Sequence, residues 1–225
     1  EFLPKLTELY VNLGQNQALY KHVQTIKDIE YSQLNTEQKK VIDNELRDFK
    51  LSGITLPPEQ QQQFKTIQNQ LSELATLFEH NVLDATDSYS RSATIDELAG
   101  VPEDSLALYK AMAEQEQQED YKITLHMPSY LPIMQYCSNR QLREELYKAY
   151  VTRASELSND AKFDNGALIG KILALRLEKA QLLGFNNYAE LSLFNKMADT
   201  PSQVLDFLHQ LAIKSRPYAE QDLTE

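Results

Sequence analysis

The sequence contains little glycine, proline or cysteine among its 225 residues. The 6 glycines and 8 prolines favour long uninterrupted elements over a turn-rich β-sandwich. The single cysteine, Cys137, excludes an internal disulfide framework and is typical of proteins from a reducing compartment. No stretch approaches the ~20 apolar residues that cross a bilayer, and the start carries no signal-like apolar segment. We therefore expect a cytoplasmic protein.

Basic residues are outnumbered by acidic ones. The 22 lysines and arginines stand against 33 aspartates and glutamates, which makes the formal net charge −11. Because an acidic excess repels phosphate backbones and anionic lipids, we expect no nucleic-acid partner and no membrane partner. Apolar residues at 42% and charged residues at 24% are typical of a soluble globular protein rather than a disordered one.

The dominant apolar spacing is that of an α-helix. Between Pro58 and Thr86, apolar residues recur every three or four positions while glutamine, asparagine and glutamate occupy the other faces. This spacing predicts one long helix that packs along a partner helix, close to the pattern of a coiled-coil seam. The apolar positions are Phe64, Ile67, Leu71, Leu74, Phe78 and Val82.

Further helices are indicated by their end signals. A helix that begins near Asn165 carries apolar residues over a wide arc, so we expect it to be buried on most sides. It ends where Gly184 can adopt the left-handed conformation. The other expected helices are one after Thr36 that ends at Ser52-Gly53, one from Pro102 to about Gln118, one capped by Asn139, and one begun by a capping box, Thr200-Pro201-Ser202-Gln203.

Only one region alternates with the period of a β-strand. Residues 121–127 place Tyr121, Ile123, Leu125 and Met127 on one side, as a half-buried strand would. Its expected partner is the stretch 88–93, and two strands alone are marginal, so the pair must lean on helices. The sequence therefore predicts a mainly α fold, with long antiparallel helices and a small two-stranded β accessory, in one domain over residues 1–225.

No metal site is predicted. The four histidines are far apart in the sequence, and none begins a His-Glu-x-x-His motif. His80 and Asp84 lie four residues apart and could share a helix face, but we interpret them as a surface pair because further ligands are missing. The histidines are His22, His80, His126 and His209.

No catalytic residue is predicted either. The sequence contains no glycine-rich phosphate loop and no Gly-x-Ser-x-Gly motif. Cys137 is interpreted as a packing residue, and Glu144-Glu145 as carboxylates that point apart on adjacent helix positions. The side chains of Tyr147, Tyr150 and Arg153 could line a cleft, although packed tyrosines with satisfied hydroxyls are the more common case.

Three stretches carry more information than the helical spacing. The first stretch is Arg47–Pro58 with its continuation Leu71–Leu74 and Phe78–Thr86; the second is Pro128–Cys137 with Arg143–Ser155; the third is Leu175–Glu190, followed by Lys196-Met197-Ala198. In the same order and with compatible spacing, these stretches resemble the N-terminal part of the thimet-oligopeptidase-like zinc metallopeptidases, and the likeness covers nearly the whole chain.

The resemblance implies an almost entirely helical enzyme with two halves that flank a deep channel for short peptides. In that family a His-Glu-x-x-His helix and a later glutamate hold zinc, which polarises the scissile carbonyl. No position of this chain matches the motif, so none of these residues is carried over. We expect a non-catalytic N-terminal segment that binds no zinc, forms one wall of the channel and partners the catalytic half of the same polypeptide. The substrate-binding residues are not identified.

The alternative is a free-standing helical module that grips a protein partner through exposed apolar helix faces. The chain opens at Glu1 inside an apolar pattern and runs to Glu225 without a helix stop signal, so we expect a segment of a longer protein. The surface that meets the catalytic half should then be unusually apolar, and the isolated segment could dimerise through it.

Overall fold

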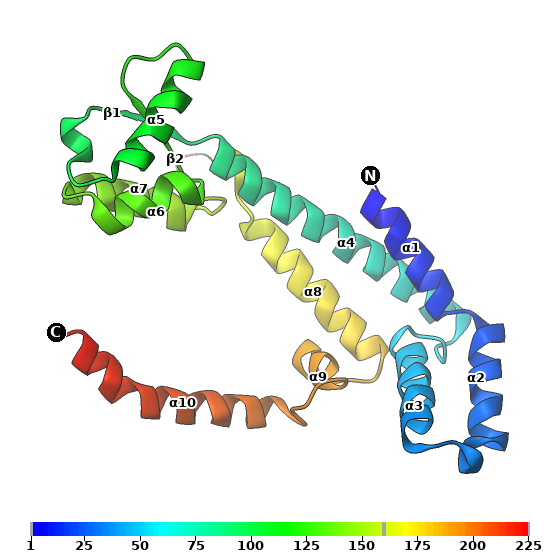
Figure 1. The fold of residues 1–225 in the computed structure, drawn as a ribbon. Coiled ribbons are helices and arrows are strands. Elements are labelled where there is room, and N and C mark those ends of the chain that lie inside the picture. Colours follow the sequence, from blue (N-terminus) through cyan, green and yellow to red (C-terminus); the bar gives the residue numbers. More distant parts are fainter. Residues whose placement is uncertain (1, 159–160, 225) are drawn as a thin grey trace. The chain divides into compact units, whose positions relative to one another are not determined.

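The computed structural model describes residues 2–158 and 161–224; Glu1, Asn159, Asp160 and Glu225 lie outside the described residues. The chain forms two compact units: unit 1 is Glu1–Glu73 with Ile172–Glu225, and unit 2 is Leu74–Lys171. Two helices, α4 (Pro58–Asp87) and α8 (Gly166–Leu182), contribute residues to both units (Figure 1). The division therefore does not contradict one domain over residues 1–225, which stays a prediction.

The predicted fold class is confirmed, because helices dominate and one small antiparallel sheet accompanies them. The long helix expected between Pro58 and Thr86 is α4, whose 30 residues end at Asp87. It runs antiparallel to α8, since Gln63 near the start of α4 donates a hydrogen bond to Glu178 near the end of α8 (2.6 Å). No helix among residues 2–158 and 161–224 combines the length and apolar character that a membrane crossing needs.

Unit 1 is built from helices joined by short connections. Phe64 and Ile67 on α4 are almost completely buried, and Lys65 beside them donates hydrogen bonds to Glu8 and Asn12 of the first helix. Besides the parts of α4 and α8, the elements are α1 (Phe2–Gly14), α2 (Gln17–Ile29), the 3-10 helix η1 (Tyr31–Gln33), α3 (Thr36–Leu51), α9 (Tyr188–Leu193) and α10 (Pro201–Asp222).

The predicted end of α8 is confirmed in detail. Gly184 has a φ of +84°, and the N–H of Phe185 donates to the carbonyl of Ala180 (2.9 Å), which is the hydrogen bond of a Schellman cap. Gly53 ends α3 in the same way, with a φ of +79° and a hydrogen bond from Ile54 N–H to Phe49 O.

The hydrogen bonds at the starts of two predicted helices differ in detail from the prediction. Asn35, rather than Thr36, caps α3, because its side chain accepts from Gln38 N–H while the Gln38 side chain accepts from Asn35 N–H. Thr200 caps α10 as predicted, with its hydroxyl accepting from Gln203 N–H (3.2 Å). The Gln203 side chain, however, accepts from the N–H of Asp199 (2.7 Å), so only half of the expected capping box forms.

Unit 2 contains the sheet and three complete helices around one core. Strand β1 (Ser90–Ala93) pairs antiparallel with β2 (Tyr121–Thr124), and Arg91 lies opposite Ile123 in the register. The remaining elements are the 3-10 helices η2 (Asp96–Leu98) and η3 (Ala161–Phe163), and the helices α5 (Glu103–Gln115), α6 (Met127–Tyr136) and α7 (Arg140–Thr152).

The main apolar core of unit 2 joins the sheet to α5, α6 and α7. Tyr109 of α5, Ile123 of β2, Ile133 of α6 and Leu146 of α7 are fully buried in a single apolar cluster. The Tyr109 hydroxyl donates to the carbonyl of Ser129 (2.8 Å), so the one polar atom of this ring is satisfied. The helices thus provide the packing that the two strands need.

Two burial predictions are wrong. The strand expected over residues 121–127 ends at Thr124, because α6 begins at Met127 and leaves that side chain 49% exposed. The helix α8 is not buried on most sides, since Leu173 is 58% exposed and Leu177 43% exposed. The described residues cover α8 mainly along the side that faces α4, and its wide apolar arc extends beyond that contact.

Candidate functional site

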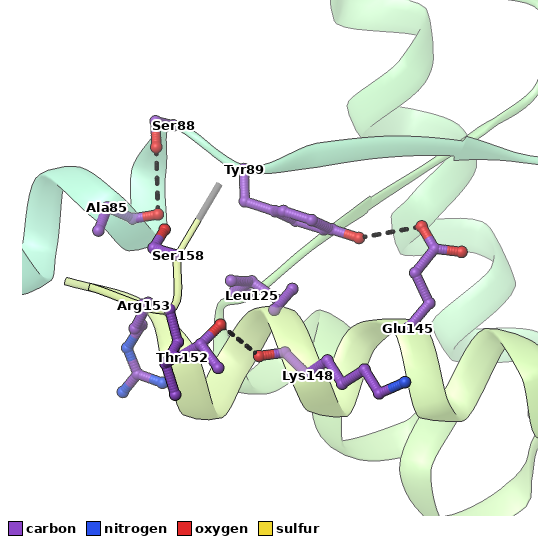
Figure 2. Close-up of a pocket in the computed structure, with 11 residues that line it drawn as sticks. Ala85, Ser88, Tyr89, Leu125, Glu145, Lys148, Thr152, Arg153 and Ser158 are labelled. Carbon is purple, nitrogen blue, oxygen red and sulfur yellow. Dashed lines mark hydrogen bonds between the residues drawn. The ribbon is translucent and has the colours of Figure 1, made fainter. Parts of the chain in front are cut away.

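A pocket lies in unit 2, beside α7. Asn139 begins this helix by accepting a hydrogen bond from Leu142 N–H (3.1 Å), as the sequence predicts. Leu142 and Leu146 face the core, and the neighbouring side of α7, which carries Glu145 and Ala149, lines the pocket. The volume is about 550 Å³, and Figure 2 shows the lining: Ala85, Ser88, Tyr89, Leu125, Glu145, Lys148, Ala149, Thr152, Arg153, Leu157 and Ser158.

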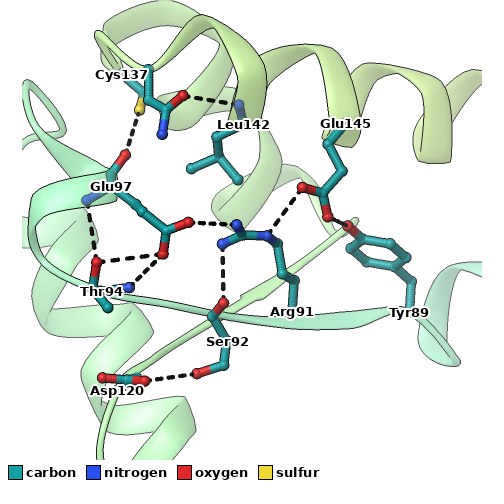
Figure 3. A network of polar contacts seen from close by, with 10 residues as sticks. Tyr89, Arg91, Ser92, Thr94, Glu97, Asp120, Cys137, Leu142 and Glu145 are labelled. Carbon is teal, nitrogen blue, oxygen red and sulfur yellow. Dashed lines mark hydrogen bonds and ion pairs between the residues drawn. The ribbon is translucent and has the colours of Figure 1, made fainter.

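A network of polar contacts is centred on Arg91 (Figure 3), and two of its members, Tyr89 and Glu145, line the pocket. The guanidinium donates from Nη2 to Glu97 Oε1 (2.6 Å) and from Nε to Glu145 Oε2 (3.2 Å). Tyr89 places its hydroxyl 3.4 Å from the other oxygen of Glu145. Because Arg91 lies on β1, Glu97 in η2 and Glu145 on α7, the network ties the sheet to the helices.

The network also sets the protonation of its members. The hydrogen bond from Arg91, helped by the backbone N–H of Thr94, lowers the pKa of Glu97 from 4.5 to about 2. Burial, followed by the charge of Glu145, raises the pKa of Tyr89 to about 12. At neutral pH the hydroxyl of Tyr89 therefore stays protonated and donates a hydrogen bond to Glu145, and Glu145 also forms an ion pair with Arg91.

Another lining residue, Arg153, packs on an aromatic stack beside the pocket. The ring of Tyr150 lies parallel to that of Tyr130, with centroids 4.4 Å apart and an interplanar angle of 17°. Arg153 lies 3.7 Å above the Tyr150 ring and donates from Nη1 to the Tyr150 carbonyl (2.6 Å). Its Nε is buried, with no hydrogen-bond partner among the described residues.

The three residues that the sequence grouped around a cleft are thus divided. Arg153 lines the pocket, Tyr150 packs between Tyr130 and Arg153, and Tyr147 is 52% exposed outside the lining. Tyr150 is therefore a packed tyrosine, and Arg153 is the only one of the three that lines the pocket.

Other residues singled out in the sequence have individual surroundings. Cys137 is buried in the core of unit 2, where its thiol donates to the carbonyl of Glu97 (3.3 Å). Glu144 pairs with Lys148 (2.6 Å), whereas Glu145 pairs with Arg91, so the adjacent carboxylates point apart. The prediction that these two carboxylates point apart agrees with the geometry.

The histidines are not brought together. His80 and Asp84 are both exposed on α4, and His126 pairs instead with Asp87, with 2.9 Å between Nε2 and Oδ1. The described part of the chain contains no group of three or more His, Cys, Asp or Glu residues that could hold a metal ion. The prediction of no metal ligands stays a prediction.

The Arg91 network was missed at the level of sequence. Arg91 and Glu145 are 54 residues apart, and no spacing rule for helices or strands connects them. The only local signal is Glu97, which lies six residues after Arg91 and accepts a hydrogen bond from Thr94 N–H (2.9 Å).

The pocket offers the guanidinium of Arg153, the protonated phenol of Tyr89 and an apolar wall. Such a lining can bind a polar ligand through hydrogen bonds.

Two family models match the chain. Residues 1–63 match the model described as "Neurolysin/Thimet oligopeptidase, N-terminal domain", and residues 133–225 match "Peptidase family M3". The second match includes the end of α6, all of α7 and the lining of the pocket that α7 provides.

Curated relatives agree with these models. Oligopeptidase A from Salmonella typhimurium is 52% identical over 226 residues, covering 99% of this chain and 33% of that protein. Oligopeptidase A from Escherichia coli is also 52% identical with the same coverage, and the probable cytosolic oligopeptidase A of Arabidopsis thaliana is 37% identical over 100% of this chain. The chain spans about one third of the length of these relatives, and it is a sequence relative of the oligopeptidase A-like peptidases of family M3.

Proposed function

We propose that the chain is the non-catalytic N-terminal segment of a cytoplasmic zinc metallo-oligopeptidase that hydrolyses short peptides. The observation that carries this proposal is the 52% identity to oligopeptidase A over 99% of the chain, together with the match of residues 1–63 to an N-terminal domain model. The identity covers 33% of the relative, which leaves two thirds of such an enzyme to supply the catalytic centre.

The zinc of the complete enzyme would be held outside this segment. The described residues offer no group of three His, Cys, Asp or Glu side chains that could hold a metal ion, so they do not fit a zinc site. The segment contributes shape instead: it forms one wall of the substrate channel and limits the size of the peptides that enter. Arg153, which has no carboxylate partner among the described residues, is the cation best placed to hold a peptide carboxyl group near that wall.

A chimera tests this proposal. The 225-residue chain is fused to the part of Salmonella typhimurium oligopeptidase A that follows its match, and a quenched fluorescent peptide reports hydrolysis. We expect the chimera to hydrolyse the peptide in a chelator-sensitive way and the 225-residue chain with added zinc to be inactive. A folded but inactive chimera, or chelator-sensitive hydrolysis by the chain alone, would contradict the proposal.

The channel wall has a separate test. A non-cleavable peptide that carries a photo-crosslinker is irradiated with the active chimera, and the attachment points are mapped by mass spectrometry. We expect attachment to residues contributed by this chain, with fewer crosslinks after Arg153→Met than after the control Arg140→Met. Crosslinks confined to the downstream part would contradict the proposal that this chain forms one wall of the substrate channel.

The alternative function is a free-standing helical interaction module, and the exposed apolar residues of α10 are the observation that favours it. The reading frame beyond Glu225 discriminates the two functions. A frame that continues into a His-Glu-x-x-His segment supports the peptidase, whereas a frame that closes without one supports the module.

A further inference from the structure

None of the 22 residues of the helix α10 is buried. Only Pro201 and Val204, in its first turn, are even partly covered. Its large apolar side chains are exposed: Phe207 63%, Leu208 50%, Leu211 52% and Tyr218 71%. An isolated helix gains little stability in water, and in folded proteins helices are stabilised mainly by packing of an apolar face. Among the residues that the structure describes, no partner therefore covers the apolar side chains of this helix.

Most of the exposed apolar residues of α10 form a face. Successive residues of an α-helix are rotated by about 100°, so residues three, four and seven positions apart lie on one side. Val204, Phe207, Leu208, Leu211 and Tyr218 satisfy this spacing, and we call them the α10 face. The opposite side is mixed, since it carries His209 and the pair of Arg216 with Glu220 (2.8 Å), and the exposed apolar residues Leu205 and Ile213 lie outside the α10 face.

We propose that the α10 face is the surface on which the downstream part of the peptidase docks, through a complementary apolar surface of its own. This inference rests on the proposed function, because the downstream part is the catalytic portion proposed above. The match to the peptidase family M3 model includes every residue of α10, and the relatives are about three times as long as this chain. The helix α10 thus lies in the part of the chain that matches the peptidase model, near the point where the match to the relatives ends.

A second copy of this chain is a less suitable occupant. Each copy has a formal net charge of −11, so two copies repel each other.

A docked α10 face should exclude water from its centre, where Phe207 and Leu211 lie. The position of Leu211 therefore reports docking directly.

Cysteine protection provides the test, because the chain has one cysteine, Cys137, and it is buried. Leu211→Cys and the control His209→Cys are introduced into the free chain and into the chimera, and maleimide labelling is followed peptide by peptide with mass spectrometry. In the chimera we expect position 211 to be labelled at least about tenfold more slowly than in the free chain, and position 209 at nearly the same rate in both. Equal labelling of position 211 in both proteins would overturn the docking proposal.

A second pair of variants checks the energetics in the chimera. We expect Leu211→Asp to lower the thermal unfolding temperature of the chimera markedly, and His209→Asp to leave it nearly unchanged. The free chain should unfold at the same temperature with either substitution, because position 211 is not packed there. Equal effects of the two variants in the chimera, or a wild-type chimera that does not fold, would count against docking through this face.

The outcomes separate the two proposals. Protection of position 211 in an inactive chimera would leave docking standing and remove the proposed function, whereas hydrolysis without protection would do the reverse. Protection that arises in the free chain and grows with its concentration would identify a second copy as the occupant, and would overturn the docking proposal.

Discussion

The core of unit 2 and the helix α10 carry similar apolar patterns with opposite outcomes. Leu142 and Leu146 of α7 are spaced four apart and are 1% and 0% exposed. Leu208 and Leu211 of α10 are spaced three apart and are 50% and 52% exposed. A helical apolar pattern therefore predicts that a face exists, but its burial depends on whether another part of the protein reaches it.

The largest expected effect comes from truncating one leucine in each region. Leu146→Ala should reduce the free energy of unfolding by about 2–5 kcal/mol, because it leaves a cavity in a closed core. Leu211→Ala should change it by less than about 0.5 kcal/mol, because the side chain is half exposed. Urea titrations of the 225-residue chain followed by far-ultraviolet circular dichroism measure both values. Similar losses in the two variants would mean that α10 is packed in solution.

The second expected effect is a pH dependence that belongs to unit 2. Folding lowers the pKa of Glu97 from 4.5 to about 2, so its ionised form is favoured in the folded state. The resulting stabilisation is present above about pH 4.5 and is lost as the pH falls from there toward 2. Glu97→Gln should flatten this part of the stability profile, and Glu156→Gln, an exposed control, should leave it unchanged. A profile that keeps its slope in Glu97→Gln would assign the dependence to other groups.

A smaller effect is expected at the ends of two helices, one in each unit. Gly184 and Gln117 both have left-handed φ values, +84° and +59°, and both follow a helix end. Gly184→Ala should cost about 1 kcal/mol, and no atom lies within 4 Å of the added methyl group, so the cost is conformational. Gln117→Gly should stabilise the chain by up to about 1 kcal/mol for the same reason. Thermal unfolding of both variants checks the opposite signs.

The smallest effect is expected from the exposed pair Glu144–Lys148 on the outer side of α7. Their side chains are 59% and 69% exposed, and such pairs contribute less than about 0.5 kcal/mol. Lys148→Ala should therefore be nearly neutral in urea titrations, in contrast to Leu146→Ala on the inner side of the same helix. A loss comparable to that of Leu146→Ala would show that the outer side is packed.

Local features were predictable where the responsible atoms are close in sequence. The cap of α7 by Asn139 and the left-handed end of α8 at Gly184 involve hydrogen bonds over three to five residues. The long helix α4 followed from its apolar spacing alone. The strand was extended too far because alternation continues through Leu125, while the helix that starts at Met127 takes over the backbone.

The candidate site was much less predictable. Arg153 was recognised as a possible lining residue, but its stacking on Tyr150 and the network of Arg91 with Glu145 depend on which elements pack together. The exposure of α8 was misjudged for a related reason. A wide apolar arc shows which residues avoid water, yet it does not show which neighbours are available.

The sequence by itself determined the helical class, the helix ends and the likeness to a peptidase family, because these depend on local backbone chemistry and on residue order. Only the tertiary structure decided which apolar faces are covered, how Arg91 gathers carboxylates from η2 and α7, and which part of α10 remains open. Burial and charge pairing are properties of segments brought together from distant positions, and the free energy of each contact depends on the partner that packing supplies.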